Sequence, residues 1–244
     1  MKIAVAGSTG LIGSQVTALA REAGHEVVGI ARQTGFDLLA PVGLTDALVG
    51  VEALIDVTQS PSLDEAEATE FFETVAANLG TAATKAGVRR TVVLSIVGAD
   101  KSPDYGYYVA KVAQEEAVRR SAPGPVVLRA TQFHEFAGQM LEWNRDGAVT
   151  RIIDVPTQPV ASAEIARLLV DLATAETAVD TDLAGPQQEG LVDQVRRLVE
   201  LRGDDLRVEA VAAPASMAGG SMLPGPDAVI RGPRWDEWVA AQQS

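Results

Sequence analysis

Short apolar runs alternate with longer amphipathic stretches along the first 130 residues of the chain. The apolar runs are nearly continuous, which is typical of strands buried on both faces of a sheet. They predict five strands, at 2–6, 26–31, 53–57, 91–95 and 125–130. The amphipathic stretches predict helices at 11–23, 63–86 and 105–120. This alternation predicts an α/β fold built on a doubly wound parallel sheet.

After about residue 131 the alternation becomes less regular. Helices are predicted at 161–174 and 191–201, and a strand at 206–211. Residues 212–233 are rich in Gly, Pro, Ala and Ser and predict a long loop, either a functional cover or a disordered segment. Trp235 and Trp238, three residues apart, predict that the C-terminal segment docks through one face. We therefore expect a dinucleotide-binding core at 1–130 and a smaller substrate-side region at 131–244, packed on the same domain.

Composition narrows the classes of function. The chain has 244 residues, a formal net charge of −13, no cysteine and two histidines. The acidic balance argues against contact with nucleic acid or an anionic membrane, since both attract clustered Lys and Arg. Without cysteine there is no disulfide or thiolate metal site, and two histidines do not make a histidine-rich metal centre, so no metal is expected. With no signal peptide or membrane-spanning run in view, we expect a cytoplasmic protein.

The strongest local motif is a glycine-rich loop between the first predicted strand and the first predicted helix. It consists of Gly7, Ser8, Thr9, Gly10, Leu11, Ile12 and Gly13. In such a loop the first glycine permits the tight turn, the second admits a pyrophosphate, and the third lets the helix pack closely on the sheet. The free backbone N–H groups at the start of the helix favour the binding of the negatively charged phosphates. The motif predicts a dinucleotide site; the alternative is a simple connecting turn.

The end of the second strand bears on the choice of cofactor. A ribose 2′-hydroxyl usually meets Asp or Glu here, whereas a 2′-phosphate meets Arg. Arg32 occupies this place, and no carboxylate occurs from Gly29 to Phe36. The sequence thus favours NADP over NAD, the alternative being a solvated surface arginine. Asp37 falls where the adenine ring would lie, or is a loop carboxylate without a ligand.

A tyrosine and a lysine share one face of the helix predicted at 105–120. Tyr107 and Lys111 are four residues apart, and Ser95 ends the fourth strand twelve residues before Tyr107. A tyrosine with its ordinary pKa of about 10 is a poor acid–base group near neutrality. A neighbouring ammonium group stabilises tyrosinate and lowers that pKa. The three residues predict a proton donor beside a substrate carbonyl; the alternative is a packed tyrosine with a solvated lysine.

Taken together, the sequence resembles the short-chain dehydrogenase/reductase superfamily, in its atypical, NmrA-like branch of NAD(P)-binding proteins. The resemblance covers roughly residues 1–175, and the following segments carry it: the loop Gly7–Gly13, the stretch 86–95, the pair Tyr107 and Lys111, and the stretch 128–133. It implies a Rossmann-type sheet with a small C-terminal substrate-side region.

The resemblance also implies roles for particular positions. Tyr107 is the general acid–base, Lys111 binds the nicotinamide ribose and tunes Tyr107, and Ser95 orients the substrate. The residues implied near the cofactor are Val57, Thr58 and Thr131, and those near the substrate are Gln132, Phe133 and His134. His134 is included because it follows Phe133 beside the expected active-site mouth, and the alternative is a structural histidine. Many members add a relay asparagine on the helix before the fourth strand, but here that place falls near Phe71 and Phe72, and Asn78 is out of register.

Three functions remain in view. The first is an NADPH-favouring oxidoreductase that reduces a small carbonyl or quinone-like molecule. The second is a redox-sensing regulator that binds NADP(H) without turnover and contacts a protein partner. The third is a sugar-nucleotide epimerase or dehydratase, which is less favoured because few basic residues lie in the C-terminal part to neutralise a diphosphate. Retention of Tyr107, Lys111 and Ser95 favours the enzyme, since a pure sensor does not need them.

Overall fold

The chain forms two compact units in a computed structural model that describes residues 1–242. The first unit contains Met1–Ile96, Gly106–Arg129 and Ala163–Thr181, and the second holds the remaining described residues. The helix near residue 170 therefore belongs with the N-terminal strands, and the nine residues that precede Gly106 belong with the second unit.

The first unit is built on a sheet that follows the predicted strands closely. Its strands are β1 (Lys2–Ala6), β2 (Glu26–Ile30), β3 (Ala53–Asp56), β4 (Arg90–Ile96) and β5 (Pro125–Ala130). They are ordered β5-β4-β3-β1-β2, and β1 pairs in parallel with both β2 and β3. Ile3 lies opposite Val27 on one side and Ala53 on the other. The predicted α/β class with a parallel, Rossmann-type sheet is confirmed.

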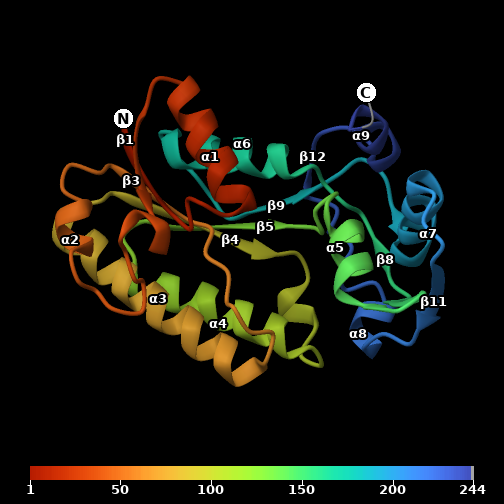
Figure 1. The fold of residues 1–244 in the computed structure, drawn as a ribbon. Coiled ribbons are helices and arrows are strands. Elements are labelled where there is room, and N and C mark those ends of the chain that lie inside the picture. The colour runs from red at the N-terminus through yellow and green to blue at the C-terminus, as the bar shows by residue number, and fades with distance from the viewer. Residues whose placement is uncertain (243–244) are drawn as a thin grey trace. The chain divides into compact units, whose positions relative to one another are not determined.

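Helices cover both faces of this sheet, as in a doubly wound fold. Figure 1 shows α3 (Glu65–Ala86) and α4 (Gly106–Ser121) on one face, and α1 (Leu11–Glu22) and α6 (Ser162–Thr174) on the other. The acidic start of α3 is confirmed, but Asp64, which the sequence predicts in the first turn, is the N-cap of the helix. Its carboxylate accepts hydrogen bonds from the backbone N–H groups of Ala66 and Glu67 at 3.0 and 3.1 Å.

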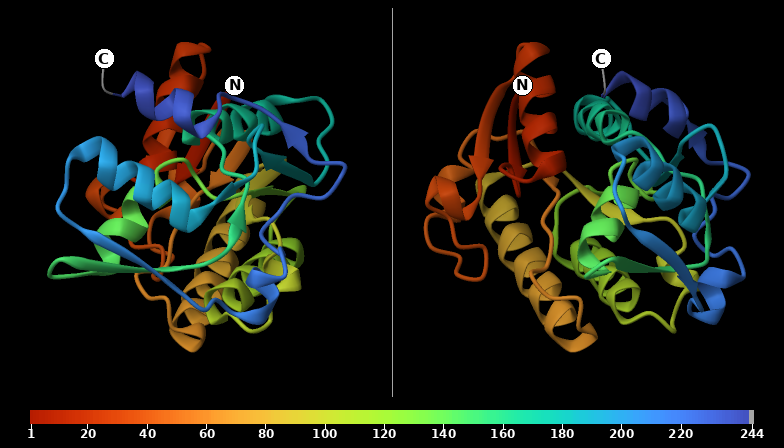
Figure 2. Two further views of the ribbon diagram at one scale, coloured as in Figure 1. Left: turned by 90° about the vertical axis from the view of Figure 1, so that its right-hand side faces the viewer. Right: turned by 45° about the vertical axis from the view of Figure 1, so that its right-hand side comes forward.

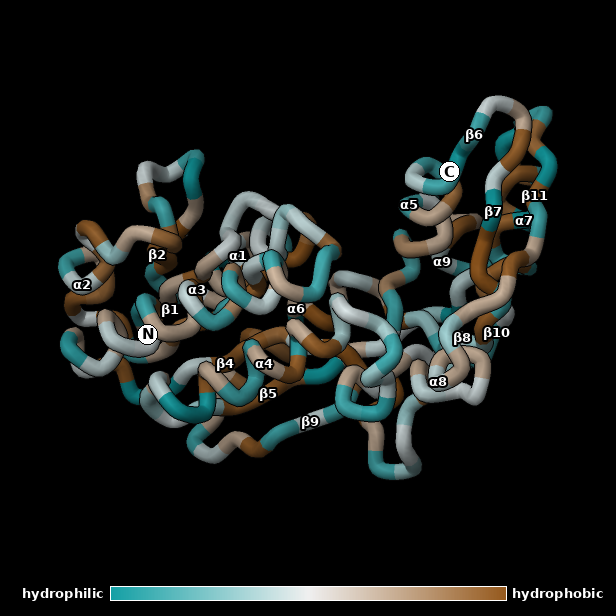
Figure 3. Tube along the Cα trace, turned by 90° about the horizontal axis from the view of Figure 1, so that it is seen from below, coloured by the Kyte–Doolittle hydropathy of each residue, from teal (hydrophilic) through white to brown (hydrophobic). Residues whose placement is uncertain are grey.

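Apolar strands form the core of the first unit, and β4 and β5 are largely brown in the hydropathy colouring of Figure 3. The sequence did not predict two further elements, the 3-10 turn Arg32–Thr34 and α2 (Leu44–Ala47), and the core explains the second of them. Leu44 and Leu48 are fully buried against β1 and α3 side chains. A helix of four residues is too short to show the 3.6-residue apolar period in the sequence. The α2 helix is therefore recognised only in the structure, where its leucines are buried.

The second unit is made of short elements. Its helices are α5 (Phe136–Trp143), α7 (Leu191–Arg202), α8 (Ala215–Ala218) and α9 (Trp235–Ala241), with a 3-10 turn at Ala99–Lys101. Its strands are β6 (Arg145–Asp146), β7 (Val149–Ile153), β8 (Pro156–Thr157), β9 (Thr181–Ala184), β10 (Glu189–Gly190), β11 (Arg207–Val211) and β12 (Val229–Ile230). Strands β11, β7 and β6 form one sheet, and α5 and α7 pack together against it (Figure 2).

The segment at 212–233 is anchored within the second unit. It contains α8 and β12, and Met217 is almost wholly buried. Ser216 donates both its backbone N–H and its hydroxyl to the Asp104 carboxylate, which lowers the pKa of that carboxyl. The hydroxyls of Ser102 and Ser221 lie 2.7 Å apart. These contacts favour an ordered segment over a disordered one.

Candidate functional site

The first unit has a topological switch point where its strand order reverses. From β1 the chain passes to β2 on one side and then to β3 on the other, so the loops that follow β1 and β3 diverge. The N–H of Gly7 donates to the Ile30 carbonyl at 2.9 Å, and the N–H of Val57 donates to the Ala6 carbonyl at 3.0 Å. In open α/β sheets, ligands bind in the crevice outside the carboxyl ends of the strands at such a point.

Two glycines of the loop after β1 are required by the fold itself. Gly7 has a φ of +81°, and a Cβ there would lie 2.8 Å from the Val57 carbonyl oxygen. A Cβ on Gly13 would lie 2.0 Å from the Gly7 carbonyl oxygen. No side chain fits at either distance, so Gly7 makes the turn and Gly13 lets α1 lie against it.

Gly10 is different, because the fold leaves space beside it. Its backbone is extended, with φ −78° and ψ 177°, and a Cβ there would meet only the Gly7 carbonyl oxygen at 3.5 Å. Gly10 is the N-cap of α1, and no side chain caps that helix. The nearby Ser8 hydroxyl is buried and has no hydrogen-bond partner among the described residues. Uncapped amides, an unpartnered hydroxyl and open space fit the phosphates of a dinucleotide.

We expect Gly13→Ala to destabilise the protein by about 3 kcal/mol or more, because the added methyl group overlaps backbone atoms that cannot move without shifting α1. Gly10→Ala is the matched control, and it should cost only about 1 kcal/mol at an N-cap. Denaturant unfolding of both variants measures this. Equal losses would mean that Gly10 is also fixed by packing and that no space is kept for a ligand.

The turn after β2 carries an arginine whose positive charge is available to bind a ligand. Arg32 is exposed, and its guanidinium enters none of the hydrogen bonds or ion pairs found within residues 1–242. The Thr9 hydroxyl donates to the Gln33 side chain at 2.9 Å, which joins the glycine loop to this turn. Asp37 accepts the Leu39 N–H at 3.0 Å in a local turn. Arg32 is therefore free to meet a phosphate, whereas Asp37 has a structural task of its own.

A buried carboxylate holds the loop that follows β3. Asp56 is 1% exposed, and one of its oxygens accepts the Thr58 N–H at 2.9 Å and the Thr58 hydroxyl at 2.7 Å. Its other oxygen accepts the Gln114 amide N–H at 3.3 Å. These bonds fix the chain at Val57 and Thr58, the two residues expected near the cofactor.

Lys111 is drawn into the interior of the first unit. The residue is 5% exposed, and its ammonium group donates to the Leu94 carbonyl at 2.8 Å and to the Gln114 side-chain oxygen. It also lies 4.7 Å from the centre of the Phe72 ring. Burial lowers the pKa of Lys111 to about 8, although the charges of Asp56 and Glu115 act in the opposite direction. The ammonium group thus acts on its surroundings mainly through its charge.

An aromatic ring occupies the place where the resemblance would put a relay asparagine. Phe72 is fully buried and packs edge-on against Tyr107, with ring centres 5.9 Å apart. The same ring lies below the Lys111 ammonium group. Asn78 donates instead to the Leu38 carbonyl at 2.9 Å. The structure therefore links Tyr107 and Lys111 through Phe72, and α3 offers no amide at this place.

Ser95 donates a hydrogen bond to the buried carboxylate of an ion pair between Glu115 and Arg129. It is 2% exposed, and its hydroxyl donates to Glu115 at 2.6 Å. Arg129 donates to the two oxygens of the same carboxylate, at 2.9 and 2.7 Å. The Ser95 hydroxyl is thus engaged within the protein, in a network that joins α4 to β4 and β5.

Thr131, expected near the cofactor, and the expected substrate residues Gln132 and Phe133 belong to the second unit, where each has a partner. The Thr131 hydroxyl donates to the Gln158 carbonyl at 2.6 Å, and Gln132 accepts the Thr157 hydroxyl at 2.7 Å. Phe133 forms an isolated β-bridge with Val160. These contacts set the path of the chain after β5.

His134 secures the C-terminal helix. It is 1% exposed, and its Nε2 lies 3.1 Å from the Pro233 carbonyl oxygen. The Trp235 indole donates to the His134 carbonyl at 3.1 Å, and the Trp238 ring lies 5.4 Å away. Burial lowers the pKa of His134, which favours the neutral ring. The predicted docking of the two tryptophans through one face is confirmed, and these contacts agree with a structural histidine.

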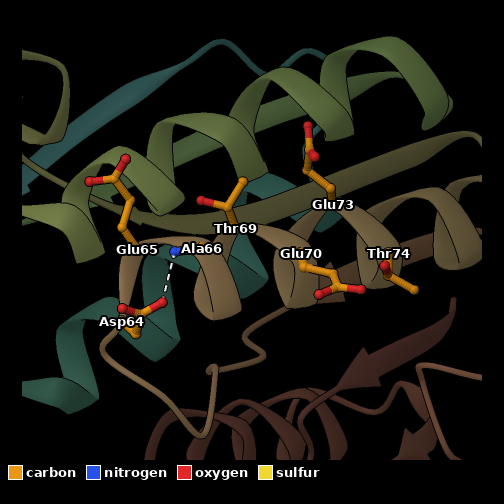
Figure 4. Close-up of a pocket in the computed structure, with 7 residues that line it drawn as sticks. All are labelled: Asp64, Glu65, Ala66, Thr69, Glu70, Glu73 and Thr74. Carbon is orange, nitrogen blue, oxygen red and sulfur yellow. Dashed lines mark hydrogen bonds between the residues drawn. The ribbon is translucent and has the colours of Figure 1, made fainter.

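A separate hollow runs along the first half of α3. Figure 4 shows the residues that line it: Asp64, Glu65, Ala66, Thr69, Glu70, Glu73 and Thr74. Four of these seven side chains are carboxylates, which repel an anionic dinucleotide. The carboxyl ends of the strands at the switch point, with the uncapped α1 amides and Arg32, suit such a ligand better. Within residues 1–242 no group of three His, Asp or Glu side chains is placed to hold a metal ion.

Sequence reasoning missed the polar residues around Lys111 and Ser95, namely the buried Asp56, Gln114 and Glu115 and the half-buried Arg129. One signal was present: a carboxylate ends the apolar strand β3, where a charge is costly unless it is paired. A second was the spacing of Gln114 and Glu115, three and four residues after Lys111.

No helix among the described residues has the length and apolar composition to cross a membrane.

Comparison with known proteins gives a family model that matches the first half of the chain, and a relative and solved structures that match most or all of it. The model of the NAD dependent epimerase/dehydratase family matches residues 3–130. The photosystem II assembly factor Ycf39 of Synechocystis is 23% identical over 234 residues, covering 86% of this chain and 71% of that protein. The structure is also similar to those of two reductases, which show its fold.

The first of these is a dTDP-4-dehydrorhamnose reductase from Clostridium acetobutylicum, with a TM-score of 0.76, 15% identity and full coverage of both chains. The second is an NADPH-dependent quinone oxidoreductase from Escherichia coli, solved with NADPH. Its TM-score is 0.75 at 17% identity, and the match covers 99% of this chain and 100% of that one.

Proposed function

The chain belongs to the NAD dependent epimerase/dehydratase family, and we propose that it is an NAD(P)H-dependent oxidoreductase that reduces a small carbonyl or quinone-like molecule. We place it among the atypical, NmrA-like short-chain dehydrogenases/reductases and propose NADPH as the preferred cofactor. The observation that carries the proposal is the pair Tyr107 and Lys111, one helical turn apart, both packed on the buried ring of Phe72.

The glycine loop would hold the cofactor phosphates, with the amides at the start of α1 and the Ser8 hydroxyl as donors. The bound nicotinamide supplies the hydride of the reduction. In our proposal Tyr107 then gives its hydroxyl proton to the oxygen of the substrate. The ammonium charge of Lys111 stabilises the tyrosinate that remains. General acid help of this kind contributes about 10²–10⁴-fold.

Ser95 takes a different part in this proposal from the one that the resemblance implies. Its hydroxyl already donates to Glu115, and releasing it would leave a buried carboxylate with one donor fewer. We therefore assign Ser95 to holding Glu115 and Arg129 in place behind α4. Thr58 and Thr131 remain the residues proposed near the ribose and the nicotinamide, and Gln132 and Phe133 those proposed near the substrate.

NADPH should bind about ten- to a hundredfold more tightly than NADH, because the Arg32 guanidinium has no partner among residues 1–242 and a contact with the 2′-phosphate is charge-assisted. Isothermal titration with both cofactors measures the ratio. Arg32→Ala should remove the preference, whereas Arg21→Ala, at the far end of α1, should leave it intact. Equal affinities in the parent protein would contradict the assignment of Arg32.

A second function has support of its own. The relative from Synechocystis is named an assembly factor, which favours a regulator that binds NADP(H) and contacts a protein partner. The presence of Phe72 where the resemblance places a relay asparagine agrees with a site that has lost turnover. The two functions differ in one assay: the enzyme consumes NADPH with a substrate, whereas the regulator binds it and changes its affinity for the partner.

A sugar-nucleotide epimerase or dehydratase is the third candidate. Its support is the family and the similarity of fold to a dTDP-4-dehydrorhamnose reductase. Such an enzyme needs cations to hold a diphosphate. In the second unit Arg151, Arg197, Arg202 and Arg207 all form ion pairs with carboxylates, which weakens this proposal.

A further inference from the structure

A continuous line of hydrogen bonds crosses the interior of the first unit from β3 to β4. It begins at Thr58, whose N–H and hydroxyl donate to Asp56, and passes through Gln114 to the Lys111 ammonium group. It ends at the Leu94 carbonyl, 2.8 Å from Lys111 Nζ. The line joins the loop expected near the cofactor to the helix that carries Tyr107.

We propose that Asp56 and Gln114 are positioning residues of this site, which hold the Lys111 ammonium group against β4 and tie it to the loop after β3. The inference rests on the proposed function only for its link to Tyr107. The bonds themselves belong to the first unit, whatever reaction it supports.

Glutamine suits the middle of this line because its side chain both donates and accepts. Its N–H group meets the Asp56 carboxylate, and its oxygen meets the Lys111 ammonium group. These two charges fix the orientation of the amide. Gln114 therefore separates a buried anion from a buried cation, so that Lys111 keeps a partner without forming a direct ion pair.

The charge of Lys111 depends on few neighbours. The carboxylates that act on it are Asp56, from β3, and Glu115, from its own helix. Glu115 is itself held by Ser95 and Arg129. The side chain that α3 places against the ammonium group is the uncharged ring of Phe72. Because burial outweighs the two carboxylates, a change of one charge in this line should move the titration of Lys111 noticeably.

Two nearly isosteric substitutions should move that titration in opposite directions. Gln114→Glu puts a carboxyl group between the Asp56 carboxylate and the ammonium group. Above the pH at which these two carboxyls lose their last shared proton, the added anion favours the charged form of Lys111 and should raise its pKa by about 1 unit or more. Asp56→Asn removes an anion that favours the charged form, so the pKa should fall below about 8. Glu116→Gln is the control, because it removes one charge from an exposed position of the same helix.

The measurement is the NMR titration of the lysine side-chain nitrogens in the ligand-free protein, which has only four lysines. Lys111→Arg identifies the signal. Opposite shifts in the two variants and no shift in the control would support the proposal. An unchanged Lys111 signal in folded Gln114→Glu protein would overturn it, even if Asp56→Asn fails to fold.

The same variants link the inference to turnover. If Tyr107 depends on the charge of Lys111, activity of the parent should fall as the pH rises through about 8, where the ammonium group loses its proton. In Gln114→Glu this fall should move to higher pH, together with the NMR titration. A shift of the NMR titration in a protein that consumes no NADPH would support the positioning role and contradict the proposed enzyme.

Discussion

Replacing Tyr107 by phenylalanine should lower turnover by about 10²-fold or more while cofactor affinity stays nearly unchanged. The change removes one hydroxyl and little volume, and the contact of the ring with Phe72 is kept. If Tyr107 gives the proton, the loss falls on the transition state and appears in kcat rather than in binding. Steady-state kinetics and cofactor titration on the same preparation separate the two quantities.

Tyr108→Phe is the matched control, because it makes the same chemical change at the next position of α4, where the side chain is buried. It should leave kcat within a few-fold of the parent. A Tyr107→Phe protein with full activity would show that hydride transfer here needs no tyrosine proton. A quinone that takes its proton from water would explain that result, and the proposal would then move from carbonyl to quinone reduction.

Gly10→Val should abolish NADPH binding in a protein that still folds. The backbone of Gly10 is in the extended region, which valine adopts readily, and only one backbone atom lies within 4 Å of an added Cβ. The branched side chain would instead fill the space beside the α1 amides that we assign to the pyrophosphate. We expect affinity to fall beyond detection by calorimetry, with a loss of stability of about 1 kcal/mol at the N-cap.

Gly10→Ala gives a graded comparison, since a single methyl group takes up less of the same space. It should weaken binding without abolishing it. A folded Gly10→Val protein that binds NADPH like the parent would mean that the glycine loop only connects β1 to α1.

The strands and long helices of the first unit could be predicted because their signals are local. β1 lies at the predicted residues, and α3 begins within two residues of its predicted start, since its cap and its apolar period agree. The second unit could not be predicted in the same way. Several of its strands, such as β8 and β10, have two residues and are defined by pairing with each other. Pairing partners this far apart in the chain leave no period in the sequence.

The candidate site likewise combines features that the sequence predicts with features that depend on contacts between distant parts of the chain. The glycine loop could be predicted, and the structure adds why its glycines differ: Gly13 is fixed by a backbone contact, whereas Gly10 is not. The spacing of Tyr107 and Lys111 was visible in the sequence, but the partners of Lys111 were not. Asp56 lies fifty-five residues before Lys111, and only the parallel pairing of β3 with β4 brings them together.

The measurement that tests the central claim most directly is NADPH oxidation by the purified protein against a panel of quinones, ketones and aldehydes, followed by the loss of NADPH absorbance. We predict substrate-dependent oxidation with at least one class, absent in Gly10→Val and lowered at least about 10²-fold in Tyr107→Phe if the substrate is a carbonyl. A parent protein that binds NADPH but oxidises it with no member of the panel would contradict the proposed reductase and favour the regulator.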